Sequence, residues 1–129
     1  MGQQQLLLIL LGVIIIGAAI VIGMTLFDDN ATSSNRDALS SDLTALALRA
    51  QGYYRRPQVL GGGGNSFLGL TMQKLSSKPS NANGTYSLTS VSANQVVLDG
   101  VGIENGNDGR NLSVTMTVSS DSTSIVLNN

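Results

Sequence analysis

The sequence predicts an α+β protein, in which one long N-terminal helix, hydrophobic in its first half and amphipathic in its second, packs on a small antiparallel β-sheet of about four strands. Three observations predict this fold class. Residues 6–27 are apolar and uncharged, apolar side chains recur at helical spacing through 37–56, and apolar and polar residues alternate along the C-terminal third. We therefore expect a helix over 1–56, a Gly-rich connecting loop over 57–84 and a sheet over 85–129.

The first half of the expected helix, residues 1–27, is strongly apolar. Eighteen side chains between Leu6 and Phe27 are apolar, and the first formal charge of the sequence is Asp28. A helix over these residues rises roughly 33 Å, which is enough to cross the hydrocarbon layer of a bilayer. A cleaved signal peptide would instead show a basic start, a shorter apolar core and a small-residue cleavage site, and this segment has none of them. Residues 6–27 are therefore expected to be shielded from water by lipid or by protein.

The second half of the expected helix, residues 28–56, carries one apolar stripe. Its members recur at helical spacing and are Leu39, Leu43, Leu46, Ala47, Ala50 and Tyr54. The opposite face is polar and comprises Asp37, Ser41, Asp42, Thr44, Arg49 and Gln51. The helix should end before Pro57, which cannot continue it. Because no proline separates the two halves, we expect one helix of about 55 residues, with the cap-forming residues of 28–36 as its weak point.

The connection is expected to be irregular. The four consecutive glycines of 61–64 favour neither helix nor strand, and Phe67, Leu68 and Leu70 then offer an apolar plug. The stretch SSKPSNANG at 76–84 is a second segment rich in turn-forming residues.

Four segments of the C-terminal third have the periodicity of strands. They cover 85–91, 94–103, 111–120 and 122–128, with turns at 92–94 and 120–122. The third segment alternates strictly, and its apolar face consists of Leu112, Val114, Met116 and Val118. The natural cover for this face is the stripe of the amphipathic helix, so the two sets are expected to form the helix–sheet core. A sheet this small, without disulfides, needs the helix for stability.

Composition argues against several classes of function. The net charge is −1 and the seven Lys and Arg residues are scattered, so no nucleic-acid site is expected. The chain has neither Cys nor His, which removes disulfides, thiolate metal sites and the commonest general base, and we expect no enzyme activity and no cofactor. Asp99, Glu104 and Asp108 offer oxygen ligands for Ca²⁺ in one loop, but their spacing matches no EF-hand, and loops of this composition are usually turns.

A charge-free apolar helix that runs into an amphipathic half backing a small antiparallel sheet resembles type IV pilins and their pseudopilin relatives. The segments YYRRP and GGGGNSF are similar to those of bacterial pilin-like proteins with the same MGQQQLLL start. The resemblance implies a precursor held in the inner membrane, from which pilus assembly machinery builds a cell-surface filament, a helical homopolymer of this chain. It also implies a filament core formed by Gln5, Leu6, Leu7, Leu10, Leu11, Ile14, Ile15, Ala18, Val21, Ile22 and Phe27.

One position departs from the pattern of that family. Most type IV pilins carry a glutamate near the N-terminus that pairs with the terminal ammonium of a neighbour, and the matching residue here is the neutral Gln5. Because a buried ammonium without an anion is unfavourable, we expect it to be blocked, hydrated or bonded by the carbonyls of Gln3, Gln4 and Gln5. No basic leader precedes Met1, so either a leader has been removed or the protein uses none.

Three functions are compatible with these features. The first is the structural subunit of an extracellular type IV pilus-like filament, and the second is a pseudopilin of a type II-like secretion system, which shares the subunit fold but forms a short periplasmic piston. The third is a single-span, membrane-anchored binding module. Single-span anchors usually carry Lys or Arg on their cytoplasmic flank, and the apolar segment has none, which favours the filament.

Overall fold

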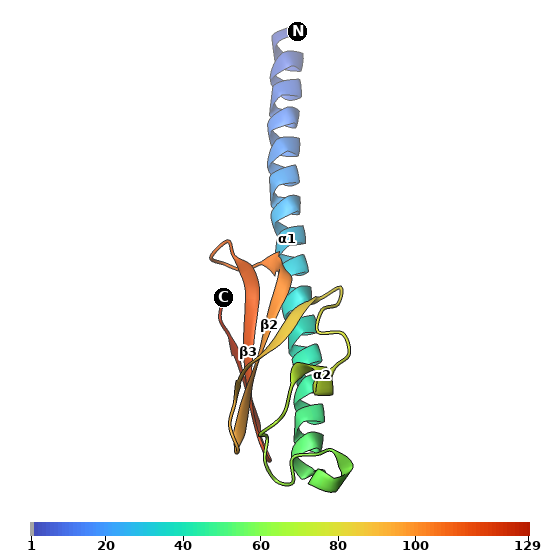
Figure 1. Ribbon diagram of the computed structural model, residues 1–129. Helices are drawn as coiled ribbons and strands as arrows, with labels where there is room; N and C mark the ends of the chain where they lie inside the picture. Colours follow the sequence, from blue (N-terminus) through green and yellow to red (C-terminus); the bar gives the residue numbers. More distant parts are fainter. Residues whose placement is uncertain (1) are drawn as a thin grey trace. The chain divides into compact units, whose positions relative to one another are not determined.

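The computed structural model describes residues 2–129 and shows an α+β protein, as the sequence predicts. Its helices are α1 (Gly2–Arg55), the single 3-10 turn η1 (Gln58–Leu60) and α2 (Met72–Leu75). Its strands are β1 (Gly84–Val91), β2 (Gln95–Asn105), β3 (Asn111–Ser119) and β4 (Thr123–Leu127), as Figure 1 shows. The chain divides into two compact units, Met1–Ala31, called unit 1 below, and Thr32–Asn129, called unit 2.

Helix α1 is a single helix of 54 residues. The polar stretch 28–36, whose residues favour caps and turns, does not interrupt it, because polar side chains of this stretch have partners in the sheet of unit 2. The hydroxyl of Thr32 donates to the backbone oxygen of Asn105 (3.2 Å), and the amide of Asn35 also bonds to sheet residues. The helix ends two residues before Pro57, since proline has no N–H and disfavours a helical residue before it.

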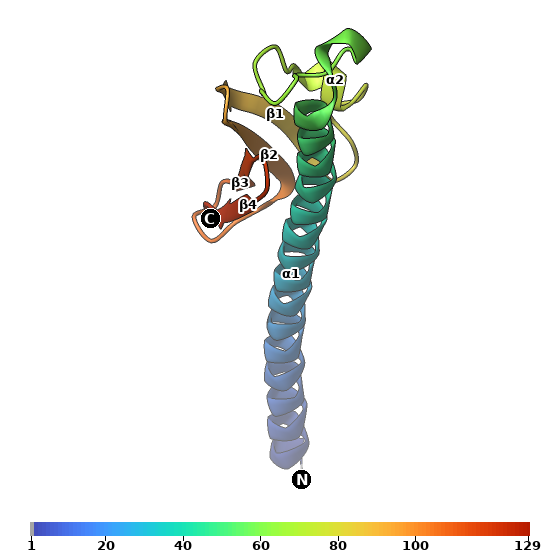
Figure 2. The ribbon, with the colours of Figure 1, turned by 90° about the horizontal axis from the view of Figure 1, so that it is seen from below.

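The four strands form one antiparallel sheet in the order β1-β2-β3-β4, so each strand pairs with its neighbour in sequence. This is the meander that the period-two alternation predicts. Tight turns join the strands: Ser92 N donates to Gln95 O (2.8 Å) between β1 and β2, and Ser119 N donates to Ser122 O (2.9 Å) between β3 and β4. Within unit 2 the curved sheet lies along one side of α1 (Figures 1 and 2).

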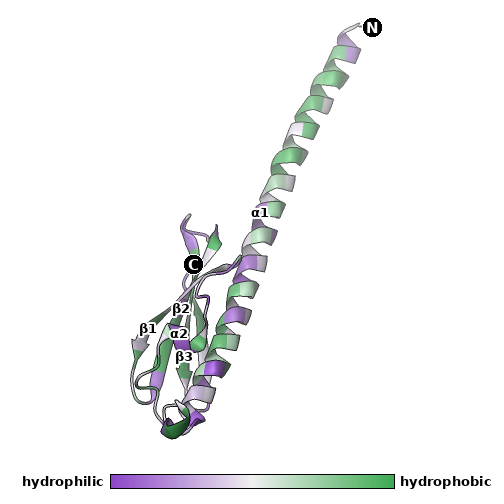
Figure 3. Ribbon diagram, turned by 45° about the vertical axis from the view of Figure 1, so that its right-hand side comes forward, coloured by the Kyte–Doolittle hydropathy of each residue, from purple (hydrophilic) through white to green (hydrophobic). Residues whose placement is uncertain are grey.

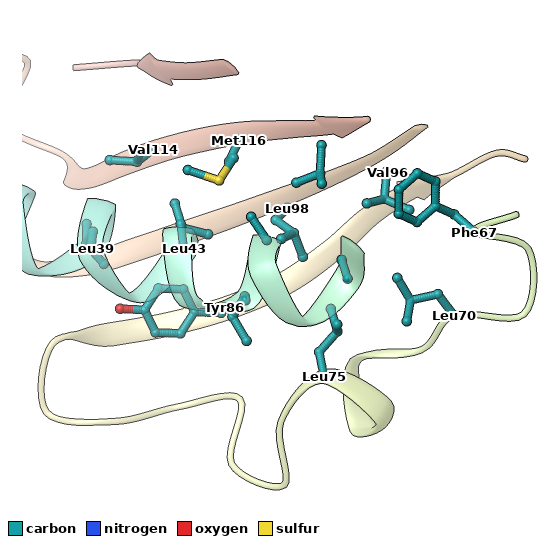
Figure 4. Packing of buried hydrophobic residues seen from close by; sticks show 14 of the residues in the cluster. Leu39, Leu43, Phe67, Leu70, Leu75, Tyr86, Val96, Leu98, Val114 and Met116 are labelled. Carbon is teal, nitrogen blue, oxygen red and sulfur yellow. The ribbon is translucent and has the colours of Figure 1, made fainter. Parts of the chain in front are cut away.

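The core of unit 2 lies between α1 and one face of the sheet, as Figure 4 shows. The strands contribute alternate residues and the helix contributes its stripe; the buried members are Leu39, Leu43, Leu46, Ala47, Ala50, Tyr86, Val96, Leu98, Leu112, Val114, Met116 and Val118. At the end of the stripe the structure differs from the expected pattern. Tyr54 is only partly buried, whereas its neighbour Tyr53 is buried and its hydroxyl donates to Leu68 O (2.9 Å).

The connection between α1 and β1 closes one end of this core. Phe67 is fully buried and Leu70 nearly so, whereas Leu68 between them is 59% exposed. The ring centroids of Phe67 and Tyr54 are 4.8 Å apart, and Phe67 N donates to Ala93 O (3.1 Å) in the β1–β2 turn. Two of the three residues expected to plug the sheet therefore do so.

Asn35 connects α1 to the other end of the sheet. It is 7% exposed, its Nδ2 donates to Asn83 O (2.7 Å), and its Oδ1 accepts from Ile103 N (3.1 Å) and Glu104 N (3.3 Å). The bonds from Ile103 N and Glu104 N fall where the β2–β3 register shifts. The Asn35 side chain therefore accepts hydrogen bonds from backbone N–H groups of β2 in the irregular stretch. The next helix residue, Arg36, donates from Nη2 to Asn129 O (3.0 Å), which places the two ends of the unit 2 sequence side by side.

Glycine is required at residue 102 because the helix approaches β2 closely there. A Cβ added to Gly102 would lie 2.2 Å from Oδ1 of Asn35, so Gly102→Ala must either displace the Asn35 side chain from its bonds to Ile103 N and Glu104 N or move the helix away from the strand. We expect it to lower the free energy of unfolding of unit 2 by about 1–3 kcal/mol, as overpacking of a tight interior does. Urea unfolding of the full chain in detergent micelles, followed by tyrosine fluorescence, measures this directly.

The matched control is Gly52→Ala, on the exposed side of α1, where an added Cβ meets nothing within 4 Å. Alanine is the better helix former by about 1 kcal/mol, so this change is expected to stabilise the unit. Shifts of the same sign in the two variants would contradict the close contact between Asn35 and Gly102.

Candidate functional site

The most unusual surface of the chain is the apolar helix surface, defined here as the side chains of Leu6–Phe27 in α1. Sixteen large apolar side chains in this segment are exposed, each by 53% to 77%. Six consecutive residues, 6–11, already point in all directions around a helix, so the surface has no polar side. Figure 3 shows this segment in the hydrophobic colour, whereas the part of α1 in unit 2 alternates between hydrophobic and hydrophilic residues. The helix is apolar and long enough to cross a membrane, and none of its most apolar stretch is buried.

The residues expected to form a filament core all lie in unit 1, and they do not share one face. Leu7, Leu11, Ile14 and Ala18 follow each other at spacings of four, three and four, which places them on one side of α1. Gln5 and Phe27 fall on the opposite side by the same count. Neighbours on more than one side would therefore be needed to cover the whole set.

Three glycines interrupt the apolar helix surface without any need inside the subunit. An added Cβ at Gly12, Gly17 or Gly23 would meet nothing within 4 Å, so no contact within the described part of the chain demands glycine there. Glycine in a helix interior lowers helix stability by about 1 kcal/mol relative to alanine. Its usual benefit in apolar helices is the close approach of another helix.

The one polar side chain inside the apolar helix surface, Thr25, bonds within its own helix. Its hydroxyl donates to the backbone oxygen of Val21 (3.0 Å), one turn earlier. A hydroxyl bonded in this way can enter an apolar environment without leaving an unpaired donor. The segment therefore presents no polar hydrogen that lipid or an apolar neighbour would leave unsatisfied.

A second group of polar residues joins α1 to the segment before β1. The carboxylate oxygen Oδ2 of Asp42 accepts hydrogen bonds from Asn81 Nδ2 (2.9 Å), Asn83 Nδ2 (3.0 Å) and the hydroxyl of Tyr86 (2.5 Å). The sequence pattern placed Asp42 on the solvent-facing side of the helix, but the structure places it against these residues. Beside it lies an open hollow of about 180 Å³ whose charged lining residues are Asp42, Arg49 and Lys78.

This arrangement shifts both ionisable partners. Burial alone would raise the pKa of Asp42, but the hydrogen bonds from Asn83, Tyr86 and Asn81 outweigh it and hold that pKa below its usual value. Burial, the bond to Asp42 and the negative charge of Asp42 raise the pKa of the Tyr86 hydroxyl well above its usual range. Tyr86 therefore stays protonated and acts as a donor, and the cluster fastens the helix to β1.

The stability of unit 2 is expected to depend on the charge of Asp42. Because its folded pKa lies below the unfolded value of about 3.9, its contribution is complete above that pH and is lost as the pH falls through the folded pKa. Asp42→Asn should lower stability at pH 7 and flatten the loss of stability below about pH 4. Urea midpoints at several pH values measure both effects.

Asp37→Asn is the matched control, since Asp37 is exposed and lies on the same helix. Both variants should still lose some stability at acid pH because of Asp108. The pKa of Asp108 is also lowered, chiefly by the backbone N–H of Arg110. If Asp42→Asn and Asp37→Asn gave the same pH profile, the bonds of Asp42 would not contribute to folding.

The acidic residues considered for Ca²⁺ do not form one site. Asp99 accepts hydrogen bonds from the hydroxyls of Thr89 and Thr115 on the neighbouring strands, whereas Asp108 accepts from Arg110 N (3.0 Å) and Asn129 Nδ2 (2.9 Å). Glu104 lies on β2. Within residues 2–129 no three acidic side chains come together in a way that would hold a metal ion.

Sequence reasoning did not find Asn35, the partners of Asp42 or the role of Tyr53. The only sequence signal for Asn35 and for the Asp42 cluster is the residue type. Asn and Asp readily bond to nearby backbone, but periodicity does not say which groups Asn35, Asp42, Asn81 and Asn83 contact. Comparison of the chain with protein-family models, with curated proteins and with solved structures gives no match.

Proposed function

We propose that this protein is the structural subunit of an extracellular helical filament similar to a type IV pilus, and that it assembles through its apolar helix surface. The observation that carries the proposal is the set of sixteen large apolar side chains, exposed on every side of α1 between Leu6 and Phe27. The role is structural, and the partner is a second copy of the same chain.

The size of this surface supports assembly. Burying one large apolar side chain contributes about 1.5–3 kcal/mol, so covering the whole surface is worth tens of kcal/mol per subunit. The apolar helix surface therefore does not stay in water. Lipid covers it before assembly, and neighbouring helices cover it after assembly. The glycines at positions 12, 17 and 23, which the subunit itself does not need, favour helices as the final cover.

Processing and delivery follow from the same proposal. The precursor would reside in the inner membrane through residues 6–27, and assembly machinery would move it into a filament on the cell surface. A pseudopilin of a secretion system would use the same subunit fold in a shorter periplasmic assembly. The length and location of the assembly therefore distinguish the two functions.

A second candidate function is a membrane-anchored binding module. It is supported by the membrane-spanning length of the apolar segment and by the polar hollow beside Asp42 in unit 2. The three glycines at positions 12, 17 and 23 argue against it, because an isolated lipid-embedded anchor does not need the close helix approach that glycine allows.

Electron microscopy of material sheared from cells that produce the protein tests the proposal. The expected result is a fibre that contains the full chain, with density for residues 6–27 at its axis in a cryo-EM map. Short, cell-bound assemblies would indicate the pseudopilin. A chain recovered only from the membrane fraction, as a detergent-soluble monomer with no fibre, would overturn the filament and favour the anchored module.

A further inference from the structure

The edge strand β4 is an open surface of unit 2. It lies at one end of the sheet, pairs only with β3, and all five of its residues are exposed. Three of them, Ile125, Val126 and Leu127, are large and apolar, with exposed fractions of 42%, 55% and 50%. The strand TSIVL contains no charge and no proline, the residues that normally protect an exposed edge.

The opposite edge of the same sheet is protected. Tyr86 N of β1 donates to Pro79 O (2.7 Å), and Gly84 O accepts from Asn81 N (2.9 Å), so the preceding segment covers the first part of the outer side of β1, residues 84–86. The register of β1 also shifts between Leu88 and Ser90, an irregularity of the kind that discourages further pairing. Within residues 2–129, one edge of the sheet is therefore partly covered and irregular, whereas the other is open.

The backbone of β4 has a row of groups that face away from β3. Ser122 O accepts from Ser119 N (2.9 Å) and Asn128 N donates to Ser113 O (2.9 Å), so the even-numbered residues bond to β3. Because bonding alternates along an antiparallel strand, the N–H and C=O groups of Thr123, Ile125 and Leu127 point toward the open side.

We propose that β4 pairs with β4 of a second copy of this chain, antiparallel and centred on Ile125. In this register Thr123 of one copy lies opposite Leu127 of the other, and every outward-facing residue meets an outward-facing residue, so the free groups of both strands are paired. Asp121 falls opposite the neutral Asn129, and no charge meets a like charge.

The side chains fit the same register. Ile125 and Leu127 lie opposite Met116 and Val114 of β3, so they are on the core-facing side of the sheet. Directly opposite residues of an antiparallel pair share a face, so the pairing places both copies of Ile125 and Leu127 together and continues the apolar face of the sheet across the contact.

The properties of the two edge strands, β1 and β4, favour a second copy of the chain as the partner of β4. A head-to-tail sheet would need β4 of one copy to meet β1 of the next, but β1 is covered at residues 84–86 and its register shifts between Leu88 and Ser90. Two neutral strands of the same sequence can pair with each other without any such obstacle. A contact of five residues per strand is weak by itself, so it forms where copies are concentrated.

This pairing has two-fold symmetry, so the α1 segments of the two paired units 2 run in opposite directions. Copies within one helical filament all share one direction and cannot be related in this way. If the proposed filament exists, which this step alone assumes, the β4 contact joins two separate filaments.

Cysteine cross-linking tests the contact, and the chain has no native cysteine. In Ile125→Cys the two thiols would lie across the symmetry axis, with Cα atoms about 5.5 Å apart, within the range of a disulfide. Ser87→Cys, an exposed position on the protected strand β1, is the matched control. Under mild oxidant, the full chain in detergent micelles should yield covalent dimer at least about tenfold faster for Ile125→Cys, which corresponds to about 1.4 kcal/mol.

A charged neighbour provides the second variant. Val126→Lys in the Ile125→Cys chain leaves an exposed side chain exposed, so unit 2 should fold, but it places like charges close to the axis and should remove most of the cross-linking. The urea midpoint of this double variant verifies that it is folded. Equal dimer yields for Ile125→Cys, Ser87→Cys and the double variant would overturn the β4 contact.

Cross-linking in micelles and recovery of fibres from cells together test this contact separately from the filament proposal. Cross-linked dimer in micelles without any fibre from cells would support the contact and overturn the filament. Fibres whose Ile125→Cys subunits never cross-link, in micelles or between fibres, would support the filament and overturn the contact.

Discussion

Replacing Phe67 with alanine is expected to lower the free energy of unfolding of unit 2 by about 3–5 kcal/mol, as removal of a buried aromatic ring does. The ring is the largest fully buried side chain of the protein among residues 2–129. Its centroid lies 4.8 Å from that of the Tyr54 ring, and it belongs to the same buried cluster as Val96 (Figure 4). Alanine would leave a cavity between the connection, α1 and β2 that neighbouring side chains fill only in part.

The loss is large relative to the stability of a domain this size, which is about 5–15 kcal/mol. Urea unfolding of the full chain in micelles measures it through the three tyrosines, all of which lie in unit 2. Leu68→Ala is the matched control, since Leu68 is the adjacent residue but largely exposed, and its change should stay within about 0.5 kcal/mol. Similar losses for the two variants would mean that the connection does not form part of the core.

Replacing Ile15 with lysine is expected to reduce the yield of fibres more than about tenfold, because lysine at the centre of an apolar helix is unfavourable by about 2.5–3.5 kcal/mol. Ile15 lies in the middle of the apolar helix surface and is 59% exposed in the subunit. Every copy in a filament would carry the same unpaired charge into the packed helices, where it has no anionic partner. The amount of protein in sheared, sedimented fibres measures the effect.

Leu48→Lys is the matched control for this change. Leu48 is a similarly exposed apolar residue of α1, but it belongs to unit 2 and lies away from the apolar helix surface. It should leave fibre yield within about twofold, because a lysine on a solvent-facing helix position has little effect. If Ile15→Lys left fibre yield unchanged, the apolar helix surface would not be the surface through which the subunits assemble.

The elements of this fold were predictable because each has its own period. Strict alternation in NLSVTMTVSS specified β3 and its buried face, and the 3.6-residue spacing of Leu39, Leu43 and Ala47 specified the stripe of α1. The change of period between α1 and the strands specified the α+β class. Local patterns carry this information because they depend only on which face of an element is apolar.

The polar contacts were not predictable in the same way. Asp42 and Tyr86 are 44 residues apart, and Asn35 reaches Glu104 across 69 residues, so their pairing depends on how the elements pack. Asp42 was placed on the solvent-facing side because it is polar, but it lies one helical turn from both Leu39 and Leu46, at the border of the stripe, where packing against the connection decides exposure. The cover of β1 by Pro79 and the lack of any cover on β4 are also properties of the assembled sheet.

The bond between Arg36 and Asn129 has a consequence for biosynthesis. The two residues are 93 positions apart, so unit 2 cannot complete its structure until its last strand has left the ribosome. At a translation rate of about 5–20 residues per second, that wait lasts roughly 5–19 seconds after Arg36 has been made. The apolar segment is already outside the ribosome by then, so on the proposed route through the membrane its insertion into lipid would precede the folding of unit 2.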